Sequence, residues 1–248
     1  MKREQEKKRM SEDGRAGSKG VLVISPHPDD VDFGCSGTVA KWSRKGKDIV
    51  YVICTSGDKG TDDPQLRPDS LAAIREEEQR RAAEVVGVRE VIFLRLRDGE
   101  LQNNRGFREI LVGMVRTHRP DVVLSMDPAN TRFENPYVSH ADHRATAVAV
   151  FDAIYPAARN RNFFPEQLEE GLTPHSVDGI YFFGTDRPNT WIDITETIEA
   201  KIEALRCHKS QVADFGSLEA RVRERYSEVG REKGMAYAEV FRYLEIPR

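Results

Sequence analysis

Short apolar runs alternate with longer amphipathic segments over the first two thirds of this 248-residue chain. The first run, VLVIS from Val21 to Ser25, is apolar throughout, as expected for a strand that is buried on both faces. Strand-like and helix-like segments that alternate in this way are typical of a parallel sheet covered by helices. We therefore predict an α/β fold with a Rossmann-like, mostly parallel sheet that is flanked by helices.

The pattern also predicts where the elements lie. The four main strands are expected at 21–25, 48–56, 90–96 and 121–126, and helices at 32–45, 70–88 and 104–118. Asp32 or Ser36 is a plausible N-cap of the first helix, and Ser70 of the second. A fourth helix is expected to begin near His140 or Ala141.

The remainder of the chain predicts a smaller C-terminal extension. Short strands are expected near 179–183 and 190–194, followed by a terminal helical region that begins at Thr195. Residues 1–19 are polar and are expected to form a disordered tail. We therefore expect a single domain over residues 20–248.

Composition excludes several classes of protein. With 38 basic and 41 acidic residues the net charge is −3, so we expect neither nucleic acid nor a membrane as a partner. No apolar run approaches the ~20 residues of a membrane helix, and the first twenty residues lack the apolar stretch of a signal peptide. The expected location is the cytoplasm. Three scattered cysteines are too few for a disulfide framework or a thiolate zinc site.

Each of the four main strands is followed by a polar cluster. These clusters are PHPDD (26–30), TSGDKG (55–60), RDGEL (97–101) and the long loop from MDP to SHADH (126–143). In an open parallel sheet, ligands bind beyond the carboxyl ends of the strands, often where the strand order reverses. If the sheet is doubly wound, all four clusters converge on one edge and form one site.

The PHPDD cluster combines an imidazole with two carboxylates in a turn made rigid by two prolines. His27 and Asp30 are three residues apart and can both reach one cation, for which a mixed nitrogen and oxygen ligand set suits zinc. Asp29 is then free to act as a general base on water. The alternative is a turn in which both aspartates satisfy the N-terminus of the following helix.

The HADH cluster lies at the start of the fourth expected helix. His140 and His143 are three residues apart, so one can complete a metal site while the other faces a substrate. Asp142 can orient an imidazole as a hydrogen-bond partner. The alternative is a helix cap with solvated histidines. Two such clusters, each after a strand of one sheet, favour the metal site.

PHPDD together with HADH resembles the PIG-L/LmbE family of zinc-dependent N-acetylglucosaminyl deacetylases. The resemblance extends through TSGDKG, the helix IREEEQRRAAEVVGV, RPDVVLSMDP and the late CHKSQ, and so spans most of residues 20 to 211. It implies an enzyme that hydrolyses the N-acetyl group of an N-acetylglucosamine-type amino sugar or its conjugate, a small-molecule substrate. It also implies a homo-oligomer, a trimer or a hexamer.

Matched residue by residue, the resemblance assigns the metal site. One Zn2+ per chain would be held by His27, Asp30 and His143. Asp29 would be the general base that activates water and then returns the proton to the leaving amine. Three protein ligands with an open position are typical of a catalytic rather than a structural zinc site.

The resemblance also implies roles for residues around the metal. His140 would stabilise the developing oxyanion, and Asp142 would set the state of that imidazole. Arg75 and Asp98 would hold sugar hydroxyls. Tyr137, three residues before His140, is a further candidate for substrate binding.

Two other functions stay open at this point. One is a non-catalytic sugar- or metal-binding relative, against which the intact Asp29 argues. The other is a metal-dependent phosphoesterase, which usually needs more bridging carboxylates to hold two ions. The chain has no GxGxxG after its first strand, no P-loop and no GxSxG motif. In the CHKSQ segment, His208, Ser210 and Gln211 are expected to border either the pocket or a subunit contact.

Overall fold

The computed structural model describes residues 20–130, 133–134 and 137–247, and at 133–134 and 137–138 it describes the backbone alone. The tail predicted over residues 1–19 therefore lies outside the described residues. Among the helices that are described, none combines the length and apolar character required to cross a bilayer.

A seven-stranded sheet in the order β3-β2-β1-β4-β7-β9-β8 forms the centre of the molecule. Its strands are β1 (Gly20–Ser25), β2 (Asp48–Thr55), β3 (Glu90–Leu96), β4 (Val122–Met126), β7 (Gly179–Phe183), β8 (Thr190–Asp193) and β9 (Ala238–Glu245). The pairs among β3, β2, β1, β4 and β7 are parallel, whereas β9 runs antiparallel to both β7 and β8. The predicted mostly parallel α/β sheet is confirmed.

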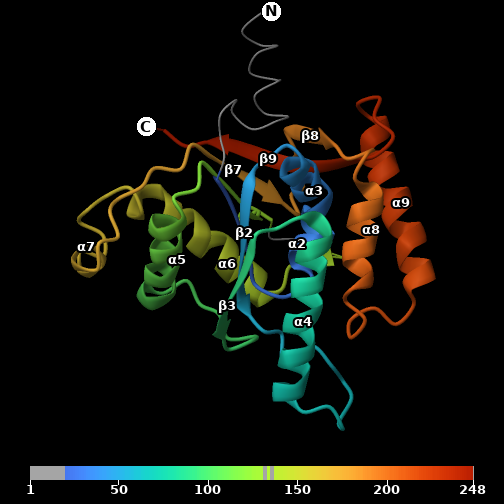
Figure 1. Cartoon of the computed structure of the whole chain (residues 1–248), viewed down its shortest axis with the longest axis horizontal. Helices are drawn as coiled ribbons and strands as arrows, with labels where there is room; N and C mark the ends of the chain where they lie inside the picture. Colours follow the sequence, from blue (N-terminus) through green and yellow to red (C-terminus); the bar gives the residue numbers. More distant parts are fainter. Residues whose placement is uncertain (1–19, 131–132, 135–136, 248) are drawn as a thin grey trace, which may run out of the picture.

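Helices cover both faces of this sheet (Figure 1). They are α2 (Asp30–Gly34), α3 (Ser36–Arg44), α4 (Pro68–Val86), α5 (Arg105–His118), α6 (Ala141–Asp152), the π-helical turn η1 (Ala153–Ala157), α7 (Glu166–Glu169), α8 (Ile198–Arg206) and α9 (Phe215–Arg231). In Figure 1, α3, α4, α8 and α9 lie on one side, and α5, α6 and α7 on the other. Two short strands, β5 (Phe133–Glu134) and β6 (Tyr137–Val138), pair in the loop before α6.

The alternation of side chains along the strands builds one apolar core on each face. Val21 and Val23 of β1 belong to the core under α3, α4 and α8, whereas Leu22 and Ile24 belong to the core under α5 and α6. Because β1 is buried on both faces, its sequence has no polar position until Ser25. Burial on both faces therefore explains the continuous apolar run, as predicted.

The strand order reverses at β1. The chain runs outward from β1 to β2 and β3, and then returns to place β4 on the other side of β1. The loops that follow β1 and β4 consequently leave the sheet on opposite sides of a shared crevice, which is where open α/β sheets bind ligands. PHPDD occupies the first of these loops, and the long loop that leads to HADH occupies the second.

Several predicted details of the elements are wrong. The helix expected at 32–45 is two helices, because Cys35 leaves the helical conformation with φ −151° and ψ 8°. Neither Asp32 nor Ser36 caps them, and the hydroxyl of Ser36 donates instead to the carbonyl oxygen of Asp32. Ser70 lies inside α4, which begins at Pro68, where the missing amide of proline is tolerated.

The C-terminal extension is confirmed in outline, but β9 is missing from the prediction. The sequence predicts helix from Thr195 onward, and the structure instead places Ala238–Glu245 as a strand between β7 and β8. In sequence, AEVFRYLE has neither a continuous apolar run nor a clean alternation. Its strand conformation comes from pairing on both sides, which is a long-range contact.

A buried ion pair joins β9 and α8 to the segment that follows β1. Lys201 Nζ lies 2.8 Å from Glu239 Oε1, and both side chains are almost fully buried. The same ammonium donates to the carbonyl oxygens of Asp32 and Phe33. Burial opposes the charge on Lys201, but Glu239 outweighs it and holds the pKa of the amine above its usual value.

Lys201→Met should therefore lower the free energy of unfolding by about 3–5 kcal/mol, because it leaves the Glu239 carboxylate buried without its cation. Adding Glu239→Gln should recover part of this loss, since no buried charge then remains. Denaturation in guanidinium chloride measures both effects. Lys209→Met, at an exposed position, should stay within about 0.5 kcal/mol of the wild type. A loss below about 1 kcal/mol for Lys201→Met would contradict this role.

Candidate active site

Asp30 lies between the two imidazoles that the sequence predicts as metal ligands. Its Oδ2 is 3.3 Å from His27 Nδ1, and its Oδ1 is 3.3 Å from His143 Nε2. The imidazole ring centroids of His27 and His143 are 5.4 Å apart. Two segments more than a hundred positions apart in the chain therefore meet, as the sequence predicts. Asp30 Oδ2 also accepts from the backbone amide of His27 at 2.9 Å, which fixes the carboxylate within the turn.

The second nitrogen of His27 faces two further carboxylates. Nε2 lies 3.0 Å from Asp98 Oδ1 and 3.3 Å from Asp142 Oδ2. Both acids are held by backbone amides: Asp142 accepts from Gly99 at 2.7 Å and from Leu101 at 3.2 Å, and Asp98 accepts from Lys59 at 3.0 Å. The loops after β2 and β3 thus contribute to the same cluster.

These contacts differ from the roles that the sequence predicts for Asp98 and Asp142. Asp98 is expected to hold sugar hydroxyls, but one of its oxygens faces His27 and the other accepts a backbone amide. Asp142 is expected to set the state of His140, but its carboxylate contacts His27. The position of the loop after β3 decides both partners, and that position is not encoded in the spacing of either motif.

The cluster strongly favours a positive charge. Burial opposes protonation of His27, yet its hydrogen bonds with Asp142, Asp30 and Asp98 raise its pKa to about 11. Ligand atoms of His27, His140 and His143 lie within 4.8 Å of one another, as do those of His27, Asp98 and Asp142. A proton on His27 supplies positive charge to the surrounding carboxylates, as a bound cation would. The residues present therefore fit a divalent metal with nitrogen and oxygen ligands.

Asp29 adopts a backbone conformation that side chains rarely take, with φ 91° and ψ −33°. Its backbone amide donates to Gln79 Oε1 at 2.8 Å, and its Oδ2 lies 3.3 Å from Arg75 Nη2. Burial, together with the charge of Asp30, raises the pKa of Asp29 to about 7, although Arg75 opposes the shift. A carboxylate of this pKa suits proton transfer near neutral pH.

Arg75 is expected to hold sugar hydroxyls, but its side chain is buried and already occupied. Nη1 donates to the carbonyl oxygen of Gly57 at 2.9 Å, and Nη2 donates to that of Pro28 at 2.7 Å. The guanidinium packs so closely on the TSGDKG loop that a Cβ added at Gly57 or Gly60 would come within 2.5 Å of Nη1. The two glycines therefore leave the space that the guanidinium occupies. From this position Arg75 contacts the carboxylate of Asp29.

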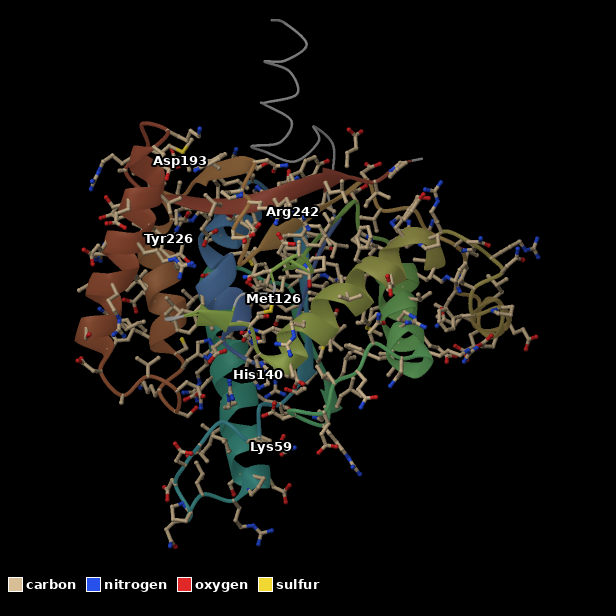
Figure 2. The ribbon with its side chains drawn as sticks, turned by 180° about the vertical axis from the view of Figure 1, so that it is seen from behind. Lys59, Met126, His140, Asp193, Tyr226 and Arg242 are labelled. Carbon is tan, nitrogen blue, oxygen red and sulfur yellow. The ribbon has the colours of Figure 1, made fainter. Side chains whose placement is uncertain are left out.

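His140 caps α6 through its ring. Its Nδ1 accepts from the backbone amide of Asp142 at 3.2 Å, which requires Nδ1 to be unprotonated. In the neutral ring the proton is then on Nε2. Burial, reinforced by the charge of His27, lowers the pKa of His140, so this neutral form prevails. Figure 2 shows the residue at the start of α6, between Met126 at the end of β4 and Lys59 in the loop after β2.

Tyr137 lies in β6, in the loop that leads to His140. Its backbone is described, but its side chain lies outside the described residues. The expectation that Tyr137 binds the substrate therefore stays a prediction.

The CHKSQ segment has a place that the sequence does not predict. His208 is buried, and its Nε2 lies 2.8 Å from Asp32 Oδ2. Ser210 donates to the carboxylate of Glu78 through both its amide and its hydroxyl. Gln211 Nε2 lies 3.2 Å from the carbonyl oxygen of Gly60. The segment thus connects the end of α8 to α4 and to the TSGDKG loop on which Arg75 packs.

Sequence reasoning also missed Gln79, whose buried amide contacts Asp29 and Asp32. One signal points to it: Gln79 follows Arg75 by four residues and so lies on the same face of α4. A described cavity of about 440 Å³ lies elsewhere, near the C-terminal end of α6 where Asp152 and Pro156 line it. The candidate metal-ligand atoms of His27, His140 and His143 converge at the opposite end of that helix. We therefore place the candidate site at those residues and not at this cavity.

Comparison with known proteins agrees with the fold. Residues 22–154 match the PIG-L family, described as GlcNAc-PI de-N-acetylase. The matched segment is more than half of the chain and includes all of the predicted catalytic, substrate-binding and metal-binding residues. The chain belongs to the PIG-L family.

Individual relatives cover 78% to 92% of the chain. Diacetylchitobiose deacetylase of Thermococcus kodakarensis is 36% identical over 228 residues, which are 91% of this chain and 83% of that protein. A probable N-acetyl-alpha-D-glucosaminyl L-malate deacetylase 2 of Bacillus anthracis is 28% identical over 78% of this chain and 81% of its own length. The structure of N,N'-diacetylchitobiose deacetylase from Pyrococcus horikoshii matches with a TM-score of 0.85 and 36% identity, covering 92% of this chain and 85% of that one.

Asp142 offers a test of the site architecture without a metal. Asp142→Ala should lower the free energy of unfolding of the metal-free protein by about 1–3 kcal/mol, because the amides of Gly99 and Leu101 lose their acceptor. Asp142→Asn retains one acceptor oxygen and should show a smaller loss. Chemical denaturation in the presence of a chelator measures both. Equal stability of the wild type and Asp142→Ala would refute the anchoring role.

Proposed function

We propose that this protein hydrolyses the N-acetyl group of an N-acetylglucosamine-type amino sugar or its conjugate, releasing acetate and the free amine. The observation that carries the proposal is the convergence of Asp29, Asp30, His27, His140 and His143 at the switch point of the sheet. The relatives support the substrate class, because their names describe deacetylases of N-acetylated sugar compounds.

His27, Asp30 and His143 would hold one Zn2+, with His27 Nδ1 as the ligand atom on the side of Asp30. The opposite nitrogen of His27 would keep its proton and donate it to Asp98 or Asp142, the arrangement that usually orients a metal-binding imidazole. A zinc ion in this position supplies Lewis acidity, which makes water a better nucleophile at neutral pH and polarises the acetyl carbonyl.

The remaining steps belong to side chains of this chain. Asp29 would accept a proton from the attacking water and return it to the departing nitrogen, which otherwise leaves poorly. His140 would donate from Nε2 to the developing oxyanion, because its Nδ1 is engaged with the helix. Removing one such donor in comparable sites lowers the rate on the order of a hundredfold or more.

A non-catalytic relative and a metal-dependent phosphoesterase remain the alternatives that the experiments must exclude. In the described cluster, Asp98 and Asp142 are engaged with backbone amides and with His27, which argues against their bridging a second metal ion. The cytoplasmic location and the assembly into a trimer or hexamer stay predictions.

Acetate release tests the activity directly. Zinc-loaded protein should form free amine and acetate from N-acetylglucosamine, N,N'-diacetylchitobiose or a related conjugate, and a chelator should abolish the reaction. Free-amine detection across a panel of N-acetylated sugars measures this, with phosphate monoesters as a parallel panel. Turnover of the phosphate esters alone, or of neither panel, would sink the proposal.

Substitutions separate the base from the ligands. Asp29→Asn should keep zinc bound but lower kcat by about 10²–10⁴-fold, because proton transfer is lost while the turn is retained. Asparagine also tolerates the positive φ of this position. His143→Ala should instead lose zinc, as measured by metal analysis after dialysis. Near-normal turnover of Asp29→Asn would show that another group is the base.

A further inference from the structure

A chain of buried polar side chains leads from His208, in the segment after α8, to the backbone of Asp29. Gln79 Oε1 accepts from the amide of Asp29 at 2.8 Å, and Gln79 Nε2 donates to Asp32 Oδ2 at 2.9 Å. The same oxygen of Asp32 contacts His208 Nε2 at 2.8 Å. Gln79, Asp32 and His208 are each at most 1% exposed, so water does not replace these bonds.

Position 79 lies between the amide of Asp29 and the carboxylate of Asp32, and glutamine suits both partners. The amide of Asp29 requires an acceptor, and the carboxylate of Asp32 requires a donor. A glutamine side chain supplies one of each, and His208, at the far side of Asp32, completes the arrangement. Glutamate at position 79 would face the carboxylate of Asp32. Methionine would leave the amide of Asp29 without its acceptor and would remove one of the two donors to Asp32.

The backbone at Asp29 needs this support. A non-glycine residue at φ 91° is strained by roughly 1–3 kcal/mol and persists because its surroundings hold it. Arg75 and Gln79, one turn apart on α4, contact Asp29 at its carboxylate and at its amide. A carboxylate held at both points has little freedom to turn away from the reacting centre.

We propose that Gln79 is a positioning residue for Asp29 and that His208 fixes the orientation of Gln79 through Asp32. This inference rests on the proposed function, in which Asp29 moves the proton. It gives the CHKSQ segment a role in the reaction that His208 exerts through Asp32 and Gln79. A displacement of about 1 Å in a catalytic group is enough to lower a rate by up to a hundredfold.

A double-mutant cycle tests the proposal. Gln79→Met should lower kcat by about 10- to 100-fold, with KM within about twofold and zinc content unchanged. In the Asp29→Asn background the same substitution should cause no further loss, because residues that act as one unit are not additive. A merely structural role would lower turnover by the same factor in both backgrounds, and that result would overturn the proposal.

Two further arms keep the test decisive. If Gln79→Met does not fold, His208→Leu should lower kcat, whereas His208→Gln, whose amide nitrogen can replace Nε2, should restore most of it; equal losses would overturn the proposal. Arg81→Met, on the exposed side of α4, is the matched control and should leave kcat unchanged.

A crystal structure of Gln79→Met supplies a readout that does not depend on activity. Asp29 should leave its positive-φ conformation or occupy two positions, and an unchanged Asp29 would contradict the proposal. If the wild type hydrolyses no N-acetylated sugar, the proposed function fails, and this structure still decides whether Gln79 holds Asp29.

Discussion

The positive-φ backbone conformation of Asp29 is the constraint on which the rest of the site depends. Two adjacent carboxylates must point in different directions, since Asp30 contacts both imidazoles while Asp29 faces Arg75. Gln79 of α4 holds this conformation by accepting from the amide of Asp29. Gln79 is itself hydrogen-bonded to Asp32, which Lys201 of α8 contacts.

Charge balance explains why these loops come together around a cation. Four aspartates gather at one edge of the sheet, and their mutual repulsion would open the loops if nothing opposed it. Arg75 offsets Asp29, and protonated His27 offsets part of the charge of the other three. A metal ion in the same place would carry more charge than the proton, so the site described without metal is already organised for one. The loops after β2 and β3 take part because their backbone amides hold Asp98 and Asp142.

The sequence predicted the sheet and the convergence of the motifs better than the partners of individual side chains. Gly179–Phe183 matches its predicted range because a strand buried on both faces needs a continuous apolar run. Glu90–Leu96, a half-buried strand at the edge of the sheet, also matches its predicted range. His27, Asp30 and His143 meet as predicted because parallel strands end at one edge. The contacts of Asp98, Asp142 and Arg75 were not predictable, since they depend on where a neighbouring loop places a backbone amide or carbonyl. The strand β9 was missed for a related reason, because its partners are distant in the chain.

The position of β9 has a consequence for how the site becomes complete. Every residue with a proposed chemical role lies between His27 and His143, yet Lys201, His208 and Glu239 hold the turn that carries Asp29. The strand that contains Glu239 is inserted between two strands that precede it in the chain. During synthesis on a ribosome, the chemistry-bearing part therefore emerges well before its support. The contacts that hold the turn of Asp29 are thus complete only after β9 has joined the sheet.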